Sequence, residues 1–117
     1  MERIFQQTYH IPGTLAANIT ITHKAALSCT LLHVSAAASN DSDATLKIGT
    51  SADTASFLAA ATIGDSGTPK EFERSSFVGT QFPRVNDGDT VIYTLDYDGS
   101  SGTAAANVTL ILTFAEG

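Results

Sequence analysis

The sequence is poor in several residues that would restrict its fold class: it has one cysteine, no tryptophan and three prolines among 117 residues. A single cysteine excludes an internal disulfide framework, so a hydrophobic core has to stabilise the fold. Cys29 lies in the strand-like run Leu27–Leu31, where we expect a buried and unreactive thiol. The missing tryptophan counts against a sugar-binding platform, because such platforms usually include that side chain.

Charge is also scarce, at 15% of the residues, against about a quarter in an average soluble domain. Twelve acidic and six basic residues give a formal net charge of −6. Because this sign disfavours phosphate and no Lys/Arg run is present, we expect no nucleic-acid partner. Threonine, serine and alanine cover the surface instead, and a neutral polar surface suits contacts between proteins.

Long apolar runs are absent as well. No stretch approaches the roughly 20 residues that a transmembrane helix needs, so we expect no membrane partner. The N-terminal residues Met1–Gln7 lack the apolar core of a signal peptide. We therefore expect a chain that folds in the cytoplasm.

The clearest pattern present is the one that closes the sequence. Apolar residues alternate with polar ones over residues 90–97 and again over 107–114, separated by the Gly/Ser loop Asp98–Gly102. Period-two alternation predicts strands with one buried and one wet face. We expect the two strands to pair with each other as an antiparallel unit.

Shorter segments upstream follow the same pattern and are separated by Gly, Asn, Asp and Pro turns. The pattern predicts strands at 4–11, 18–23, 27–34, 45–50 and 70–77, with 27–34 as a central strand and 57–63 as either a strand or a short helical turn. About eight short strands predict an all-β fold, a single antiparallel β-sandwich of jelly-roll type. We expect one domain over residues 1–117, with residues 1–12 as a possible N-terminal arm or edge strand.

The alternation also predicts which side chains form the core. The expected core comprises Ile19, Ile21, Leu31, Ile48, Val91, Tyr93, Leu95, Val108, Leu110 and Leu112.

Two pairs of aspartates could suggest a calcium site, Asp87/Asp89 and Asp96/Asp98. Calcium needs six to eight oxygen ligands, and no glutamate follows at the spacing of an EF-hand. Asp and Gly are also the residues that tight turns prefer. We therefore expect turn residues here and no bound metal, although a cation at these turns stays open.

Catalytic and cofactor-binding patterns are equally sparse. His10, His23 and His33 fall on separate predicted strands without the close pair typical of zinc sites. No Gly-x-Ser-x-Gly motif and no phosphate-binding glycine loop occurs. We therefore expect no enzymatic activity and no cofactor.

The closing unit also carries a resemblance. The turn Asn86–Asp89 before residues 91–97, the passage Leu32–Ala37 and the Ala/Thr/Ser-rich composition resemble small β-sandwich virion structural proteins of tailed bacteriophages. These include head decoration (cement) proteins and minor head or tail proteins. The resemblance implies a non-enzymatic capsid decoration protein that binds and stabilises the phage head. It also implies self-association, preferably as a trimer, the major capsid protein as partner, and a place on the virion surface after synthesis in the host cytoplasm.

An alternative function is a carbohydrate-binding or adhesin-like β-sandwich module used in host attachment. For either function, the segment Glu2–Ile11 is the expected docking element, because it alternates, is polar and ends at Pro12-Gly13. An extended segment of this kind can add a strand to a partner. The expected partner-binding residues are Arg3, Phe5, Gln7 and Tyr9.

Overall fold

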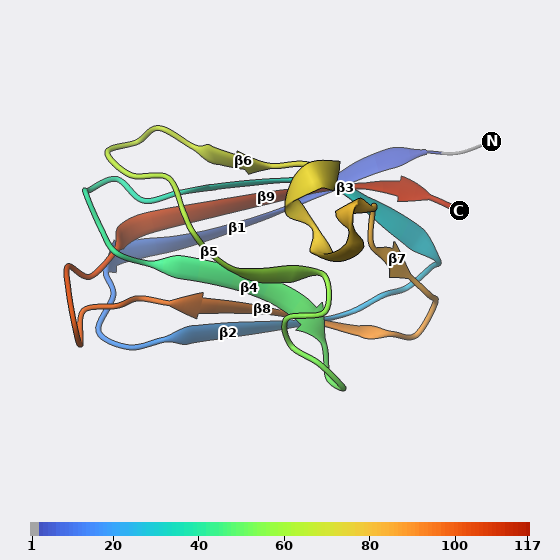
Figure 1. The fold of residues 1–117 in the computed structure, drawn as a ribbon, viewed down its shortest axis with the longest axis horizontal. Coiled ribbons are helices and arrows are strands. Elements are labelled where there is room, and N and C mark those ends of the chain that lie inside the picture. The colour runs from blue at the N-terminus through green and yellow to red at the C-terminus, as the bar shows by residue number, and fades with distance from the viewer. Residues whose placement is uncertain (1–2) are drawn as a thin grey trace.

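The computed structural model describes residues 3–117, which form two antiparallel β-sheets stacked face to face (Figure 1). The nine strands are β1 (Ile4–Thr14), β2 (Ile19–Lys24), β3 (Cys29–Ala37), β4 (Thr45–Thr50), β5 (Leu58–Thr62), β6 (Lys70–Phe72), β7 (Arg84–Val85), β8 (Thr90–Asp96) and β9 (Ala106–Glu116). Two short 3₁₀ turns, η1 (Arg74–Ser76) and η2 (Val78–Thr80), lie between β6 and β7. In residues 3–117, no helix is long and apolar enough to cross a membrane.

The strand order is that of a jelly roll with one extra short strand. The first sheet has the order β1-β9-β3-β6, with β7 also paired to β3, and the second has the order β2-β8-β4-β5. Most connections therefore cross from one sheet to the other, as in a double-sheet jelly roll. The predicted all-β antiparallel sandwich is confirmed, with nine strands where about eight were expected.

One predicted pairing is wrong. Strand β8 pairs with β2 and β4, whereas β9 pairs with β1 and β3 in the opposite sheet. Residues 97–105 carry the chain across the sandwich instead of closing a hairpin. Alternation shows that each strand buries one face. It does not show whether the next strand along the chain lies beside it in the same sheet or packs against it from the opposite sheet.

The core lies between the two sheets and contains most of the predicted side chains. Eight of the ten are buried, namely Leu31, Ile48, Val91, Tyr93, Leu95, Val108, Leu110 and Leu112. The other two, Ile19 and Ile21, are half-buried and pack against the core from the edge strand β2. Their position at an edge explains the difference, because only one side of such a strand is covered by a neighbour.

The observed bounds of three strands can be compared with the predicted ones. The segment 57–63 contains strand β5 (Leu58–Thr62) and no helical turn, whereas the strand predicted over 70–77 stops at Phe72 and gives way to η1. Strand β1 continues past Pro12 because its register with β9 shifts there. The N–H of Gly13 donates to Oδ1 of Asn107 at 2.8 Å, with a φ of 79° at Gly13 that suits only glycine without strain.

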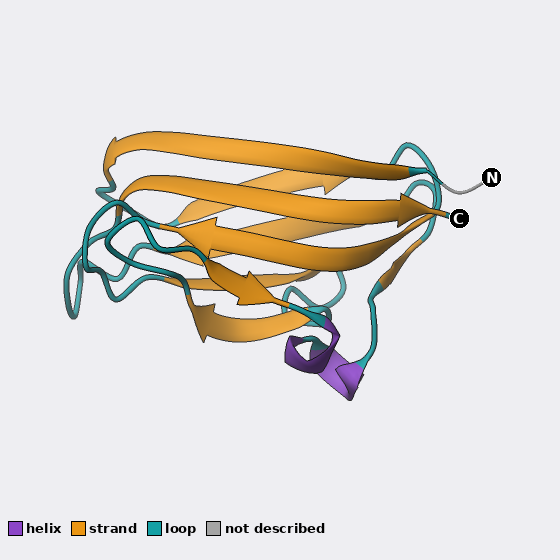
Figure 2. Cartoon of the chain, turned by 90° about the horizontal axis from the view of Figure 1, so that it is seen from above, coloured by secondary structure: helices purple, strands orange, loops and turns teal. Residues whose placement is uncertain are grey.

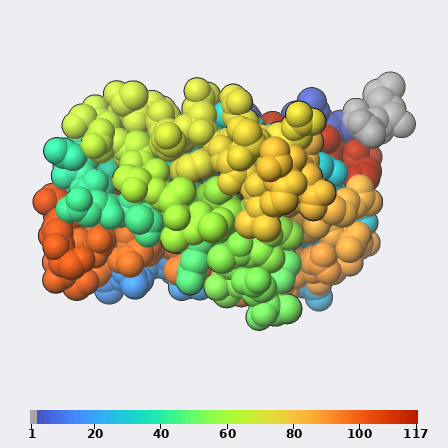
Figure 3. Space-filling view, in the orientation of Figure 1, coloured from blue at the N-terminus to red at the C-terminus, as the bar shows by residue number. Residues whose placement is uncertain are grey.

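The two sides of the sandwich differ in how they are covered. Strands β5 and β6, with residues 63–83, form what we call the closed margin; this segment passes from one sheet to the other and covers the gap between them (Figure 3). Its backbone is tied to both sheets, through Gly64 N–H to Ala36 O at 3.0 Å and Val78 N–H to Phe57 O at 3.0 Å. Strands β1 and β2 form the open margin, where each is the edge strand of its sheet.

Candidate interaction surface

Strand β1 presents two sets of side chains on its opposite faces. Side chains at odd positions from 5 to 11 are half-buried and point toward the other sheet, whereas those at even positions from 4 to 10 are exposed on the outer face. Ile4 is 68% exposed, which makes it the most exposed large apolar side chain in the described chain. Figure 2 shows β1 as the long strand that starts near the N-terminal label and runs along the edge of its sheet.

The backbone of β1 follows the same parity. The N–H of Glu116 donates to the carbonyl of Arg3 at 2.7 Å, which continues the uninterrupted register that runs from Ile4 opposite Ala115 to Ile11 opposite Val108. In an antiparallel pair, hydrogen-bonded and non-hydrogen-bonded residues alternate. Odd residues of β1 therefore bond to β9, and the N–H and C=O groups of the even residues point away from the sheet.

Aromatic packing holds the inner face of β1 to the core. The ring of Phe5 stacks on Phe114 with centroids 5.3 Å apart and an interplanar angle of 15°. Further along the strand, the ring of Tyr9 lies 5.5 Å from that of Tyr93 on β8. The edge strand is therefore fixed in place by side chains from both sheets.

A polar network centred on Gln7 joins the two sheets at the open margin. Nε2 of Gln7 lies 3.0 Å from Nε2 of His23 on β2. Oε1 of Gln7 accepts from the hydroxyl of Tyr9 at 3.3 Å and from that of Tyr93 at 3.5 Å. Because the amide donates to the imidazole, the network requires a neutral His23 with an unprotonated Nε2.

Burial shifts the titration of this network in the direction that keeps it neutral. Loss of solvent lowers the pKa of His23 and raises the pKa of Tyr9. The pKa of Tyr93 is raised further, mainly by burial and then by the neighbouring Tyr9 and Cys29. At neutral pH, hydrogen bonds between uncharged groups therefore join the two sheets at the open margin.

The four predicted partner-binding residues occupy two kinds of position. Phe5, Gln7 and Tyr9 point inward along the open margin and are half-buried. The Arg3 side chain is 77% exposed and lies 3.2 Å from the carboxylate of Glu116. The exposed outer-face side chains of β1 were missed, because alternation gives the two faces of a strand but not which one meets the core.

A small apolar cavity of about 80 Å³ adjoins the inner face of β1. It lies among Phe5, Phe114, Leu27, Val85 and Val91, with Gln7 and His23 at its polar side. Cys29 also lines the cavity; the thiol is buried, and burial raises its pKa despite the opposing charge of Arg84. The expected buried cysteine is confirmed.

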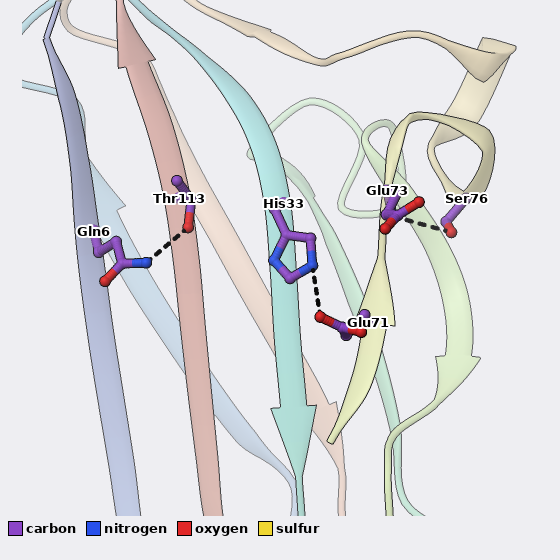
Figure 4. A network of polar contacts seen from close by, with 6 residues as sticks. All are labelled: Gln6, His33, Glu71, Glu73, Ser76 and Thr113. Carbon is purple, nitrogen blue, oxygen red and sulfur yellow. Dashed lines mark hydrogen bonds and ion pairs between the residues drawn. The ribbon is translucent and has the colours of Figure 1, made fainter. Parts of the chain in front are cut away.

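A second concave region lies on the outer face of the first sheet, near η1. The groove is about 410 Å³ and is lined by Leu32, His33, Glu73, Arg74, Ser75 and Phe82. Nε2 of His33 lies 3.3 Å from the carboxylate of Glu71, and Phe82 is 41% exposed. Figure 4 shows this pair in a row of polar contacts that extends across the sheet to Gln6 and Thr113. No sequence motif predicts this groove, since its residues come from separate segments.

The aspartate pairs take part in turns. Asp89 Oδ2 accepts from the N–H of Asn86 at 2.9 Å, in a turn that also contains Gly88 with a φ of 89°. Asp96 Oδ1 accepts from the N–H of Asp98 at 3.0 Å. The side chains of Asp89 and Asp96 therefore have the turn role that was expected.

The three histidines do not converge. His10 and His33 lie on the outer face of the first sheet. His10 is hydrogen-bonded to Thr109 Oγ1 at 2.9 Å, and His33 is paired with Glu71. His23 instead faces the open margin. Within residues 3–117, no group of three or more His, Cys, Asp or Glu side chains is arranged to hold a metal ion.

Comparison with known proteins gives likenesses of fold and no family. No family model matches the chain, and no curated protein matches it in sequence. A chain of the cyanophage Pam1 capsid asymmetric unit shares its fold over 99% of this chain and 85% of that one, with a TM-score of 0.54 and 14% identity. A chain of the infectious bursal disease virus Gx strain is also similar over 100% of this chain and 32% of its own, with a TM-score of 0.42 and 16% identity. The first likeness establishes a common fold, and the second is too weak to add to it.

Proposed function

We propose that the chain is a non-enzymatic structural protein of a virion, which decorates a phage head and stabilises it. The observation that carries this proposal is the jelly-roll fold shared with a chain of the cyanophage Pam1 capsid asymmetric unit over 99% of this chain and 85% of that one. The neutral outer faces of the sandwich fit a role in protein contact, since only 15% of the residues are charged. The proposed location is the capsid surface, after synthesis in the host cytoplasm.

The proposed partners are the major capsid protein and further copies of this chain, with a trimer as the preferred assembly. The docking surface that we propose is the outer face of the first sheet next to the open margin. It carries Ile4, Gln6 and Thr8 from β1 beside Thr113 and Ile111 from β9. Uncharged side chains on a regular sheet can be buried without the cost of desolvating charge. Arg3, Phe5, Gln7 and Tyr9 stay proposed contact residues at its border.

The test is binding of the full chain to phage heads assembled without it. We expect cosedimentation that saturates at a fixed number of copies per head, and a higher temperature of head disruption. A charge placed on the outer face, Thr113→Lys, should weaken binding, while Thr20→Lys on the outer face of β2 should leave it unchanged. Heads that bind no chain, or bind both variants equally, would contradict the proposal or its docking surface.

A second candidate, sugar binding for host attachment, is favoured by the groove near η1. An exposed aromatic ring at Phe82 lies there beside Arg74, Glu73 and His33, which could donate and accept hydrogen bonds to hydroxyl groups. Glycan-array binding that disappears in Phe82→Ala, together with no binding to heads, would favour this function over the first.

A further inference from the structure

The free edge of β1 lacks the protection that edge strands usually have. Natural sheets protect their edges with short strands, charged residues, prolines or bulges. Strand β1 spans 11 residues, whereas the other edge strands β2, β5, β6 and β7 span 6, 5, 3 and 2. Between Ile4 and Ile11 there is no Asp, Glu, Lys or Arg and no break in the register with β9. Protection starts only at Pro12 and Gly13.

Pro12 lies where the ladder with β9 is interrupted. It has no partner residue on β9, so its missing N–H costs the ladder within the chain no hydrogen bond. The main-chain groups of Ile4, Gln6, Thr8 and His10 are a complete row of donors and acceptors without a partner strand in the described chain. Such a row is a template for one more strand.

We propose that the partner strand is β1 of a second copy of this chain, paired antiparallel about a two-fold axis beside Gln7. Parity restricts the register, because even residues must face even residues to form hydrogen-bonded pairs. With Ile4 opposite His10 and Gln6 opposite Thr8, all four even residues of each strand form hydrogen-bonded pairs with the other copy. This register gives about eight main-chain hydrogen bonds, two for each facing pair.

The side chains are self-complementary in the same register. On the inner face, Phe5 comes opposite Tyr9 of the second copy, and aromatic cross-strand pairs stabilise antiparallel sheets. On the outer face, Gln6 and Thr8 can exchange hydrogen bonds. Two copies that each carry a net charge of −6 repel one another over most orientations. Across β1 they meet without any formal charge on the paired residues; β5 is also uncharged but offers only five residues, and β2 and β6 each contain a lysine.

The pairing goes beyond the proposed function and does not depend on it. It joins the first sheets of two copies into one continuous sheet and leaves the outer faces exposed on the same side. A trimer contact, where present, would use another surface, because the two-fold contact consumes the β1 edge.

The first experiment measures the mass of the full chain by analytical ultracentrifugation from about 1 to 200 µM. We expect a concentration-dependent species of twice the 12.2 kDa chain mass. Thr8→Pro should weaken it by on the order of tenfold or more, because each dimer of chains loses two main-chain hydrogen bonds, one from each copy. The thermal midpoint of the separated chain should change little, since the N–H of Thr8 does not bond to β9.

A charge exchange tests the register even if the proline disturbs the strand. The double variant Gln6→Lys/Thr8→Lys places like charges opposite each other across the axis and should be monomeric. The variant Gln6→Glu/Thr8→Lys places Glu opposite Lys twice and should restore the pair. Ser35→Lys, on the same outer face but on β3, is the control and should pair like wild type.

Each other outcome overturns the proposal. A chain that stays monomeric over the whole range does not self-pair, and if Thr8→Pro then loses head binding, the occupant of the edge is a strand of the shell. Association that neither Thr8→Pro nor Gln6→Lys/Thr8→Lys affects, including a trimer, uses a different surface.

Discussion

The open and closed margins complete the same sandwich in different ways. At the closed margin, Phe72 and Phe77 belong to the segment 63–83 itself and are only 2% and 3% exposed. At the open margin, Phe5 and Tyr9 are only half-buried and a polar network joins the sheets. The closed margin is finished by the chain itself, whereas the open margin keeps its aromatic side chains and a backbone edge accessible. We infer that stability is concentrated at one side of the molecule and recognition at the other.

The largest expected effect comes from a substitution in the core, which destabilises both margins together. Leu110 lies in β9 opposite Tyr9 of β1 and Ala36 of β3, and is 1% exposed. Leu110→Asp buries an unpaired carboxylate and should destabilise the fold by more than about 4 kcal/mol. Chemical denaturation measures the loss, and a variant as stable as wild type would show that this face does not point into the core.

A matched pair of truncations compares the margins directly. Phe77→Ala should cost about 3–5 kcal/mol, the usual range for a buried phenylalanine. Phe5→Ala should cost about half as much, because the ring is partly exposed before the substitution. Equal losses in the free energy of unfolding would contradict the distinction between the two margins.

A matched pair of glycines makes the same comparison in the backbone. A Cβ at Gly64 would meet the main chain of Thr68, Pro69 and Lys70, whereas a Cβ at Gly13 has nothing within 4 Å. Gly64→Ala should therefore cost about 2–3 kcal/mol through displacement of the closed segment. Gly13→Ala should cost only about 1 kcal/mol, from its positive φ. The reverse order, measured by thermal unfolding, would contradict the packing of residues 63–70.

These margins also mark what could be predicted from the sequence. Alternation over 90–97 and 107–114 correctly gave strands and buried faces, because that pattern is local. It could not place β8 and β9 in opposite sheets, since pairing depends on the crossing 97–105 and on strands far away in sequence. A strand was predicted over 70–77, but charged neighbours flank Phe72 and the expected core included neither Phe72 nor Phe77, so their burial at the closed margin was not foreseen. The network of Gln7 and His23 was hidden because its residues lie on two strands that face each other only in the fold.

The smallest expected effect is a pH dependence confined to the open margin. Burial holds the pKa of His23 below its ordinary value of 6.5. The stability that neutral His23 contributes is complete above about pH 6.5 and is lost as the pH falls toward the lower pKa of the folded state, because the unfolded chain binds the proton more readily. No carboxylate lies within ion-pair distance of His23 among residues 3–117 to oppose this.

The measurement is the thermal midpoint at pH 7.5 and pH 5 for wild type and His23→Gln. The drop on acidification should be smaller in the variant, with His10→Gln, on the outer face, as the control that behaves like wild type. An identical decrease in the thermal midpoint of wild type and His23→Gln would show that His23 does not cause the pH dependence.

Amide hydrogen exchange along β1, followed residue by residue by NMR at low and high concentration, tests the central claim most directly. The account predicts that the odd amides of Phe5, Gln7 and Tyr9 are protected at every concentration by β9. The even amides of Gln6, Thr8 and His10 should exchange rapidly in dilute solution and become protected as copies pair. Even amides that exchange rapidly at all concentrations, or odd and even amides that exchange alike, would contradict a free edge that recognises its own copy.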